Sequence, residues 1–373
     1  MQCYLELLKR ILTTGEVQYE PRTQECILGI TGAQYQFSDV RESFPLVTTR
    51  QIHPRLAFEE LFWKLRGERS VASLVARGVD YWNGNAFQKY LEREGLDKEI
   101  PKHTERWNTA FGAWKKRLDD REEDGDLGPI YGYQWRHWRR PVFFQRFHDG
   151  NGWVDDHWGV EEVDQLENLL EGIRERPGSR YHILNAYNPG EIGDMAIGPC
   201  PFWHQFTVYG DQLDLFMVQR SCDILLGVPY NDAQEAALLH MIAQETGLIP
   251  RRFVHSLGNV HAYLGVPPRS DFWMDTGNVM EFQIRVASVT ERTGYLEVRD
   301  WYLETALGEG ELNLGKDHIP NILTQLSKRP RASPRLELKR IPLLEAIQMP
   351  AKEVLKVVDY KPHKGKSHSV MAV

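Results

Sequence analysis

Cys200 stands in a segment whose residue types suit nucleophilic chemistry. It follows Gly198 and Pro199, so the chain turns there and the thiol lies at the lip of a strand. A thiolate attacks electron-poor carbon, and a neighbouring cation favours the thiolate over the thiol. The alternative is a small buried hydrophobic residue, since free cysteine commonly plays that part. The local sequence leaves both interpretations open.

Arg220 and Ser221 lie in the segment Gln219–Asp223, which follows an apolar strand. A guanidinium beside a hydroxyl offers charge-assisted and neutral hydrogen-bond donors to a phosphate. A pair between Arg220 and Asp223 at a surface strand end explains the same residues without a ligand. The segment therefore indicates either a phosphate site or an ordinary strand terminus.

Three further polar residues suit the recognition of a nucleoside. Asn231 offers an amide donor and a carbonyl acceptor, which match a base edge such as that of uracil. An N-cap or turn asparagine explains Asn231 equally well. His261 and Tyr263 are two residues apart, so on a strand they share one face. They either grip a sugar hydroxyl or pack with their polar tips bonded.

The composition limits the classes of protein to which these residues belong. The 373 residues are 42% hydrophobic and 11% aromatic, which is enough apolar surface for one large core. The net charge of -7 argues against a general electrostatic grip on nucleic acid, and no apolar run is long enough to span a membrane. Neither GxGxxG after a strand nor GxxxxGK[ST] occurs, which disfavours an NAD- or ATP-dependent enzyme.

The N-terminal residues and the cysteines favour a cytoplasmic protein. Residues 1–9 mix polar and apolar side chains and lack the apolar core of a signal peptide. The four cysteines are scattered and form no CxxC pair, so we expect free thiols in a reducing compartment and no metal.

The apolar pattern predicts the elements that must position the candidate residues. We expect helices over 1–12, 56–75, 163–176 and 232–246, a hairpin followed by an extended strand over 26–48, and strands over 182–184, 202–209, 213–218, 253–263, 281–287 and 335–341. Many strands with a few long helices indicate an α+β fold.

The absence of a Gly/Ser linker predicts a single domain over residues 1–373. Two stretches are expected to be surface insertions in it. The stretch at about 86–124 is charged and favours helix, whereas the stretch at about 139–160 is rich in Trp, His, Asp and Gly and is expected to be irregular.

Several dispersed motifs are specific when their order and spacing are taken together. They are Phe44–Thr49, Glu60–Trp63, Gly125–Pro129, Tyr131–Arg136, Gln219–Asp223, Gly227–Asn231 and Met371–Val373. In these motifs, and over most of its length, the chain resembles thymidylate synthase. The resemblance lapses in the two insertions. It implies an α+β fold in which helices pack on a mixed β-sheet, and a homodimer whose interface is a face of that sheet.

The resemblance implies that the substrate is dUMP. Cys200 matches the family's nucleophile, which attacks C6 of the pyrimidine, and Arg220 is the cation expected to favour its thiolate. Asn231 matches the residue that reads the uracil edge. Arg180 matches an arginine that reaches the phosphate from the second subunit. The nucleotide-binding positions are Arg22, Arg180, Gln219, Arg220, Ser221, Asn231, His261 and Tyr263.

The resemblance also implies 5,10-methylenetetrahydrofolate as co-substrate, with no metal and no nucleic-acid or membrane partner. Glu60 matches a glutamate that organises proton transfers through water, with Tyr131 in the same network. Without the resemblance, Glu60 is equally a carboxylate on a helix surface. The catalytic set is Cys200, Glu60, Tyr131, Asn231, Asp223 and Arg220. The folate positions are Trp82, Asp223, Leu226, Gly227, Tyr230 and Val373, of which Val373 is expected to close over the co-substrate.

Five positions depart from the family's pattern, namely Arg50, Asn83, Tyr181, Pro201 and Asn259. Two folate-dependent outcomes remain open. Hydride donation from tetrahydrofolate yields dTMP and dihydrofolate, whereas capture by water yields 5-hydroxymethyl-dUMP and tetrahydrofolate. A third hypothesis is a non-catalytic relative that binds nucleotide or RNA, and the presence of Cys200 and Glu60 argues against it.

Overall fold

The computed structural model describes residues 1–20, 25–102, 104–144, 157–307 and 316–364. The chain forms two compact units. Unit 1 comprises Met1–Phe58, Val208–Leu343 and Ala351–Val373, and unit 2 comprises Glu59–Thr207 and Leu344–Pro350. Their helices and strands confirm the α+β prediction.

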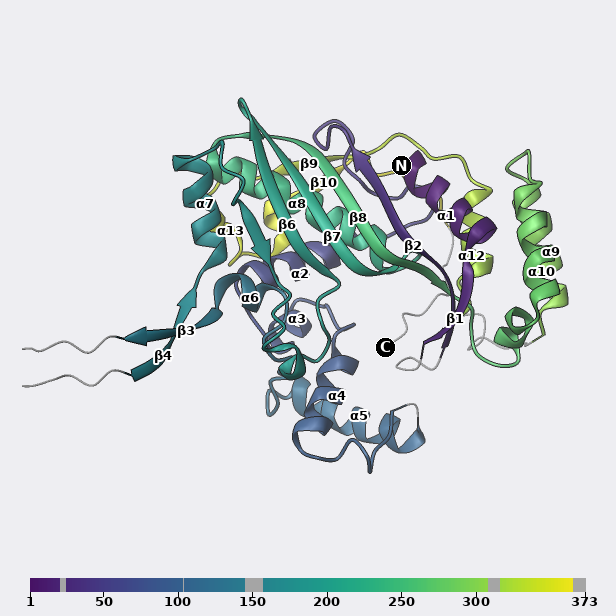
Figure 1. Ribbon diagram of the computed structural model, residues 1–373, viewed down its shortest axis with the longest axis horizontal. Coiled ribbons are helices and arrows are strands. Elements are labelled where there is room, and N and C mark those ends of the chain that lie inside the picture. The colour runs from purple at the N-terminus through teal and green to yellow at the C-terminus, as the bar shows by residue number, and fades with distance from the viewer. Residues whose placement is uncertain (21–24, 103, 145–156, 308–315, 365–373) are drawn as a thin grey trace, which may run out of the picture. The chain divides into compact units, whose positions relative to one another are not determined.

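Unit 1 is built on four strands that lie side by side (Figure 1). In spatial order they are β1 (Glu16–Glu20), β2 (Glu25–Phe37), β8 (Ile249–Tyr263) and β7 (Gln212–Asp223). β2 is antiparallel to β1 and β8, whereas β7 and β8 run parallel, so Ser221 pairs with Asn259 and Asp223 pairs with His261. The carboxyl ends of β7 and β8 therefore bring candidate residues to the same edge of the sheet.

The prediction of a hairpin and an extended strand over 26–48 is wrong in its placement. The hairpin is formed by β1 and β2, and β2 alone continues from Glu25 to Phe37. β2 is long because it pairs with β8 from Ile27 to Phe37, and β8 lies more than 200 residues away in the sequence. Alternation within one segment gives no information about such a distant partner.

The long helix α8 (Gly227–Thr246) packs against β7 and β8. Most of its side chains are buried, including Ala237, Leu238 and Ile242. It ends at Gly247, whose φ of 73° is a left-handed conformation that glycine adopts without steric cost. The predicted helix over 232–246 is confirmed, but α8 begins at Gly227. Asn231 therefore lies inside the helix and is not its N-cap.

Two more helices and a small sheet complete the core of unit 1. The predicted N-terminal helix is confirmed as α1 (Gln2–Thr14), whose buried side chains include Leu5, Leu8 and Leu12. α12 (Ile319–Leu326) contacts α1. β9 (Arg335–Leu338) pairs with β10 (Leu355–Val358), which follows the short helix α14 (Ala351–Val354). The predicted strand over 335–341 is thus confirmed in its first half.

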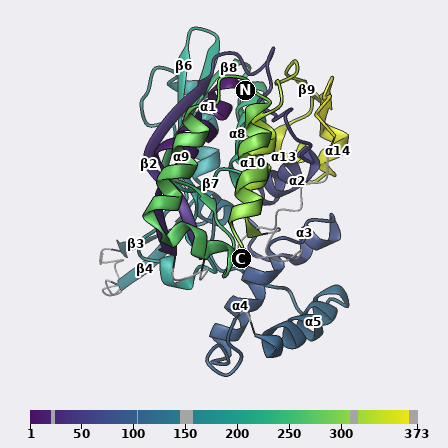
Figure 2. The same cartoon turned by 90° about the vertical axis from the view of Figure 1, so that its right-hand side faces the viewer.

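Residues 265–316 connect two neighbouring points of unit 1, and the described part of this segment, which we call the excursion, is largely helical. Leu264 forms a bridge with Asp317, and the His318 N–H donates to the Tyr263 carbonyl at 2.9 Å. The excursion contains η2 (Arg269–Met274), α9 (Thr276–Ala287) and α10 (Gly294–Thr305), and the two α-helices lie side by side (Figure 2). It is anchored to the turn at Asp317, whose carboxylate accepts a hydrogen bond from the Tyr302 hydroxyl at 2.9 Å.

The prediction of a strand over 281–287 is wrong, because these residues lie in α9. The alternation of Phe282, Ile284 and Val286 with polar residues suggested a strand. Two signals of a helix outweigh it. Asp275 caps the helix by accepting from the N–H groups of residues 277 and 278, and Phe282 and Val286 are buried with helical i, i+4 spacing.

We predict that Asp317 makes the stability of the protein fall as pH rises from about 4 to 6. Asp317 is fully buried, and burial raises its pKa to about 6 from 3.8. The folded state therefore holds this proton more tightly than the unfolded chain, so the free energy of unfolding declines as the pH passes through this interval. The expected loss is about 3 kcal/mol, since one pKa unit corresponds to about 1.4 kcal/mol.

Urea unfolding of the wild type and of Asp317→Asn at pH values across this interval measures the effect. The amide does not titrate, so the stability of Asp317→Asn should rise relative to the wild type by the stated amount between acidic and neutral pH. Parallel stability curves for the two proteins would contradict the assignment.

Unit 2 holds most of the remaining helices. They are α3 (Ala72–Ala76), α4 (Asn83–Arg93), α5 (Glu105–Asp119), α6 (Gly132–Arg136), α7 (Gln165–Glu175) and the greater part of α2 (Pro54–Leu65). The helix predicted over 163–176 is confirmed as α7. The single helix predicted over 56–75 is wrong, because α2 ends at Leu65 and Gly67 then adopts a φ of 71°. A Cβ on Gly67 would approach the side chain of Arg136 to 2.7 Å, so the turn requires glycine.

Unit 2 also contains the antiparallel strand pair β5 (Ile183–Asn185) and β6 (Pro201–Tyr209). They confirm the strands predicted over 182–184 and 202–209. The 3₁₀ turn η1 (Ile192–Asp194) lies between them in sequence. Residues 201–207 of β6 belong to unit 2 and its last two residues to unit 1.

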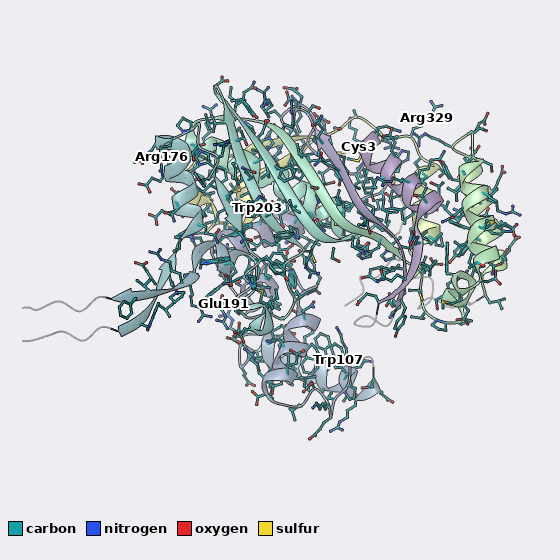
Figure 3. All side chains as sticks on the ribbon, viewed as in Figure 1. Cys3, Trp107, Arg176, Glu191, Trp203 and Arg329 are labelled. Atoms are coloured by element: carbon teal, nitrogen blue, oxygen red, sulfur yellow. The ribbon has the colours of Figure 1, made fainter. Side chains whose placement is uncertain are left out.

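The described residues of the two stretches predicted as insertions are ordered. α4 and α5 are held by an aromatic cluster in which Phe87 contacts Trp107, Phe111 and Trp114, and Figure 3 labels Trp107 at this helix pair. In the second stretch, β3 (Trp138–Phe144) and β4 (His157–Val163) form an antiparallel ribbon, which corrects the expectation of irregular structure. Residues 145–156 lie outside the described part. Within that part, no helix is long and apolar enough to cross a membrane.

Candidate active site

Glu60 lies on α2 with hydrogen-bond donors at both of its oxygens. Its Oε2 accepts from the Tyr81 hydroxyl at 2.7 Å, and its Oε1 accepts from the Trp82 indole N–H at 3.1 Å. The Nζ of Lys64, one helical turn later, lies 3.4 Å from Oε1. Glu60 is 7% exposed and Lys64 is 2% exposed. A buried carboxylate held in this way has a fixed orientation and is not a solvated helix-surface group.

Tyr131 connects this carboxylate to the candidate nucleophile. The backbone N–H of Cys200 donates to the Tyr131 hydroxyl at 3.1 Å. The Tyr131 ring contacts that of Trp82, with centroids 5.7 Å apart, and Lys64 Nζ lies 4.4 Å from its centroid. We call Glu60, Lys64, Trp82, Tyr131 and Cys200 the Cys200 cluster.

The backbone around Tyr131 is specialised for this contact. Tyr131 has a φ of 44°, which L-residues rarely adopt. A Cβ on the next residue, Gly132, would approach the Lys64 carbonyl to 1.8 Å. Glycine is therefore required for α6 to lie against α2, and this approach places Tyr131 between Lys64 and Cys200. Strained conformations of this kind gather at functional sites.

Cys200 is a half-buried, free thiol immediately before β6. Pro201 is the first residue of β6, a position at which proline costs no ladder hydrogen bond. The thiol is thus placed at the start of a strand, as the sequence predicts, and it is less buried than Cys222 or Cys26. The thiol is therefore not a fully buried packing residue.

In unit 1, Gln219 and Asn231 form a second polar group. Gln219 Nε2 donates to Asn231 Oδ1 at 3.1 Å and to the Ser221 carbonyl at 2.9 Å. Gln219 and Ser221 alternate along β7 with Arg220, which is exposed. The amide of Asn231 is therefore held by the strand that carries the candidate phosphate ligands.

Asp223 is the last residue of β7, and its two carboxylate oxygens differ in their hydrogen bonds to the described residues. Its Oδ1 accepts from the N–H groups of Leu225 and Leu226, both at 3.0 Å, and lies 3.5 Å from His318 Nδ1. Burial alone raises the pKa of Asp223, but the neighbouring His318 and the Leu226 N–H together bring that pKa below its usual value. Among the described residues, Oδ2 has no hydrogen-bond partner. An ionised, buried acceptor of this kind fits a ligand that presents N–H donors.

His261 and Tyr263 are buried side chains at the end of β8 whose rings meet edge to face, with centroids 5.3 Å apart. His261 Nδ1 lies 2.7 Å from Asn259 Oδ1. Burial lowers the pKa of His261, so its imidazole is neutral at neutral pH. The residue opposite His261 on β2 is Gly29, where a Cβ would lie 3.4 Å from His261 Cβ. The predicted sharing of one face is therefore observed.

Comparison with known proteins identifies the family of this sequence. The family model described as Thymidylate synthase matches residues 2–373. The chain belongs to the thymidylate synthase family. It is 37% identical over 262 residues to "Thymidylate synthase 1/2" of Encephalitozoon cuniculi (strain GB-M1), covering 70% of this chain and 77% of that protein. It is 38% identical over 264 residues to "Thymidylate synthase" of Equine herpesvirus 2 (strain 86/87), covering 70% and 78%.

A third relative is a fusion. Over 263 residues the chain is 36% identical to "Bifunctional dihydrofolate reductase-thymidylate synthase" of Leishmania major, covering 70% of this chain and 44% of that protein. Members of the thymidylate synthase family are methyltransferases, so the chain is an enzyme of this class.

The structure separates the predicted thymidylate synthase residues into two groups. Unit 2 contains Glu60, Trp82, Tyr131, Arg180 and Cys200, and unit 1 contains Gln219, Arg220, Ser221, Asp223, Leu226, Gly227, Tyr230, Asn231, His261 and Tyr263. Leu226 and Gly227 form the start of α8, and the Tyr230 hydroxyl accepts from the His53 N–H at 3.3 Å. Arg22 and Val373 lie outside the described residues.

The departures from the family's pattern have different local settings. The Arg50 guanidinium donates to the Leu225 carbonyl, beside the Asp223 loop. Asn83 is buried at the start of α4, and within the described chain its amide has no hydrogen-bond partner. Tyr181 is 90% exposed.

Sequence reasoning missed several residues that hold the candidate groups in place. They are Lys64, Tyr81, His255, Asp232, Tyr35 and His318. The i, i+4 spacing of Glu60 and Lys64 could have predicted their contact, because residues at this spacing meet on one helix face. Tyr81 and Asp232 neighbour the candidates Trp82 and Asn231 in the sequence, whereas Tyr35, His255 and His318 lie far along the chain from the groups that they contact. No local pattern marks any of these five residues. Among the described residues, no cluster of three or more His, Cys, Asp or Glu side chains has the arrangement of a metal site.

Proposed function

We propose that this enzyme transfers one carbon from 5,10-methylenetetrahydrofolate to C5 of dUMP and yields dTMP and dihydrofolate. The observation that carries the proposal is the Cys200 cluster, in which Tyr131 holds the backbone of the half-buried Cys200 and contacts Trp82 and Lys64, the partners of the buried Glu60 carboxylate. A nucleophile and a general acid–base held in one network are what addition to a pyrimidine and the subsequent proton transfers require.

In this proposal Cys200 adds to C6 of the uracil ring and makes C5 nucleophilic. Glu60, oriented by Tyr81 and Trp82, organises the water that carries protons to and from the pyrimidine. Arg220 and Ser221 bind the phosphate, and His261 and Tyr263 bind the deoxyribose hydroxyl. Arg22 is proposed as a further phosphate ligand.

The co-substrate supplies the one-carbon unit and then the hydride that completes the methyl group. The uncommitted Oδ2 of Asp223 is an observation that fits it, because a pterin ring presents N–H donors to an ionised acceptor. Trp82, Leu226, Gly227 and Tyr230 are proposed to pack against the folate, and Val373 to exclude water from it. No metal enters the proposed reaction.

Product analysis tests the proposal directly. The enzyme is incubated with dUMP and methylenetetrahydrofolate, and nucleotides and folates are resolved by mass. We expect dTMP with dihydrofolate. The appearance of 5-hydroxymethyl-dUMP with tetrahydrofolate would instead show that water captures the activated methylene, and the proposal would then be replaced by a hydroxymethylase. Absence of both products would reject folate-dependent transfer to dUMP.

We further propose a cytoplasmic homodimer in which a face of the sheet forms the interface and Arg180 acts in the partner's site. The exposure of the neighbouring Tyr181 supports an outward-facing surface in this segment. Mixing Arg180→Ala with Cys200→Ser tests the proposal, because a shared site regenerates one intact site in each mixed dimer. In a symmetric dimer that mixes at random, recovery of about a quarter of wild-type activity is expected. No recovery, or an active monomer in sedimentation, would contradict it.

Replacing Asn231 with aspartate should change the preferred base. A carboxylate accepts a hydrogen bond from the amino group of cytosine but repels O4 of uracil. The ratio of kcat/KM for dUMP to that for dCMP should fall by about 100-fold or more, because one favourable contact is lost and another is gained. Steady-state kinetics on both nucleotides measures it. An unchanged ratio would mean that the base is read elsewhere.

A further inference from the structure

Five side chains of unit 1 form a buried series of polar contacts behind Asn231, which we call the Asn231 relay. The Tyr35 hydroxyl donates to Asp232 Oδ2 at 2.7 Å, and Asp232 Oδ1 lies 2.8 Å from His255 Nδ1. His255 Nε2 lies 3.1 Å from Gln219 Oε1, and Gln219 Nε2 donates to Asn231 Oδ1 at 3.1 Å. The relay links β2, β8, β7 and α8, and its central histidine is fully buried.

A backbone carbonyl fixes the orientation of the Gln219 amide within the relay. The Ser221 carbonyl lies 2.9 Å from the Gln219 side chain and needs a donor there. Only the amide nitrogen supplies one, since a carbonyl oxygen never donates. Gln219 Nε2 is therefore directed at Ser221 and Asn231, and Gln219 Oε1 is directed at His255.

His255 must carry a hydrogen on Nε2 as a consequence. Gln219 Oε1 is an acceptor, so the ring nitrogen that faces it has to donate. Asp232 and Tyr35 hold the opposite side of the ring, where one hydrogen lies between His255 Nδ1 and Asp232 Oδ1. Aromatic neighbours pack against the ring, whose orientation is set by its polar contacts. Phe253 stacks on it with centroids 5.8 Å apart, and Tyr35 meets it edge to face at 5.4 Å.

The contact between Gln219 and Asn231 determines where the amide oxygen and the amide nitrogen of Asn231 point. Its Oδ1 accepts from Gln219, so its oxygen and nitrogen cannot exchange places without breaking that hydrogen bond. This matters because a free amide is ambiguous. In one orientation it pairs with N3–H and O4 of uracil, and after a half-turn it pairs with N3 and the amino group of cytosine. An asparagine alone therefore distinguishes the two bases poorly.

We propose that His255 is a positioning residue that makes the site specific for uracil by fixing the amide orientations of Gln219 and Asn231. Asp232 and Tyr35 serve the same end by holding the imidazole ring. The inference rests on the proposed binding of dUMP. The inference names the residues that hold the Asn231 amide in the one orientation that binds uracil and not cytosine.

The test compares the binding of dUMP and dCMP by calorimetry in the wild type and in His255→Phe. Phenylalanine keeps an aromatic ring between Phe253 and Tyr35 but removes the donor to Gln219 Oε1. The ratio of the dCMP to the dUMP dissociation constant should fall by about tenfold or more, because the amide can then turn. The matched control is Phe253→Leu, which disturbs the same aromatic packing, leaves every polar contact of the relay in place and should keep the wild-type ratio.

The outcomes separate this inference from the function on which it rests. Wild-type protein that binds neither nucleotide would overturn the proposed substrate, and the inference would fall with it. Wild-type protein that prefers dUMP, together with an unchanged ratio in His255→Phe, would overturn the role of His255 alone. An equal loss of preference in Phe253→Leu would assign the effect to packing and would also overturn it.

A measurement on the unaltered side chain applies if His255→Phe does not fold. Long-range ¹H–¹⁵N spectra of histidine-labelled protein report which ring nitrogen is protonated, and the shift caused by Asp232→Asn identifies the His255 signal. The relay requires a protonated Nε2 at neutral pH. A bare Nε2 would contradict the proposal, because Gln219 Oε1 would then have no donor.

Discussion

Replacing Cys200 with serine should lower turnover by at least about 10⁴-fold and leave dUMP affinity within about threefold of the wild type. A serine hydroxyl is a far weaker nucleophile than a thiolate, so addition to the pyrimidine fails. Binding survives because Tyr131 accepts from the backbone N–H of residue 200, and serine keeps that N–H. The fold around the nucleophile is thus unchanged by the substitution.

The matched control is Cys3→Ser. Cys3 is also a half-buried free thiol, but it lies in unit 1, whereas Cys200 lies in unit 2. It should retain wild-type turnover. Intact-mass analysis with 5-fluoro-dUMP and methylenetetrahydrofolate supplies an independent readout. We expect a covalent adduct with the wild type and with Cys3→Ser, and none with Cys200→Ser. Residual turnover above about 1% in Cys200→Ser would refute the nucleophile assignment, because loss of a covalent nucleophile costs far more.

Replacing Glu60 with glutamine is expected to lower kcat by about 10²- to 10⁴-fold, the range of a general acid–base contribution. The amide keeps the volume of the side chain but carries no charge and cannot accept a proton at neutral pH. It also offers an N–H group where the Tyr81 or Trp82 donor now points. The effect should fall on kcat more than on the KM for dUMP, because Glu60 acts on protons and does not hold the nucleotide.

Glu59→Gln provides the control for Glu60→Gln. Glu59 is the preceding residue on α2, is also buried, and pairs with Arg77 at 3.6 Å. It lies outside the Cys200 cluster, so its substitution should affect stability but leave kcat near the wild-type value. If both variants lost the same activity, the loss would reflect damage to α2. If Glu60→Gln kept kcat within about threefold, general acid–base catalysis by Glu60 would be excluded.

Local sequence signals predicted the parts of the fold that depend on local physics. The helices α1, α7 and α8 follow from apolar residues at helical spacing, and each is present. The prediction of a strand over 281–287 was wrong. The alternation of apolar and polar residues there indicated a strand, but the N-cap at Asp275 begins a helix that includes these residues. The hairpin predicted over 26–48 failed because the extent of β2 is set by β8, which lies far away in the sequence.

The candidate site also contains residues that local sequence predicts and residues that it does not. Motifs identified Cys200, Asn231 and Asp223, since a nucleophile, an amide and a carboxylate are recognisable by type. The residues that orient them were not predictable in this way. His255 is separated from Gln219 by 36 positions and from Tyr35 by 220, so only the folded sheet brings their side chains together. The residue types of the candidate site are recognisable in the sequence, whereas the contacts that orient them are not.

The adjacency of Leu264 and Asp317 has a consequence for how much the length of the segment between them can vary. Because the excursion over 265–316 leaves and rejoins the sheet at neighbouring points, its removal or addition changes no strand register. Closing so long a loop costs only modestly more entropy than closing a short one. We therefore expect a change in the length of this segment to leave the pairing of β2 and β8 intact, provided that the buried contact between Tyr302 and Asp317 is kept.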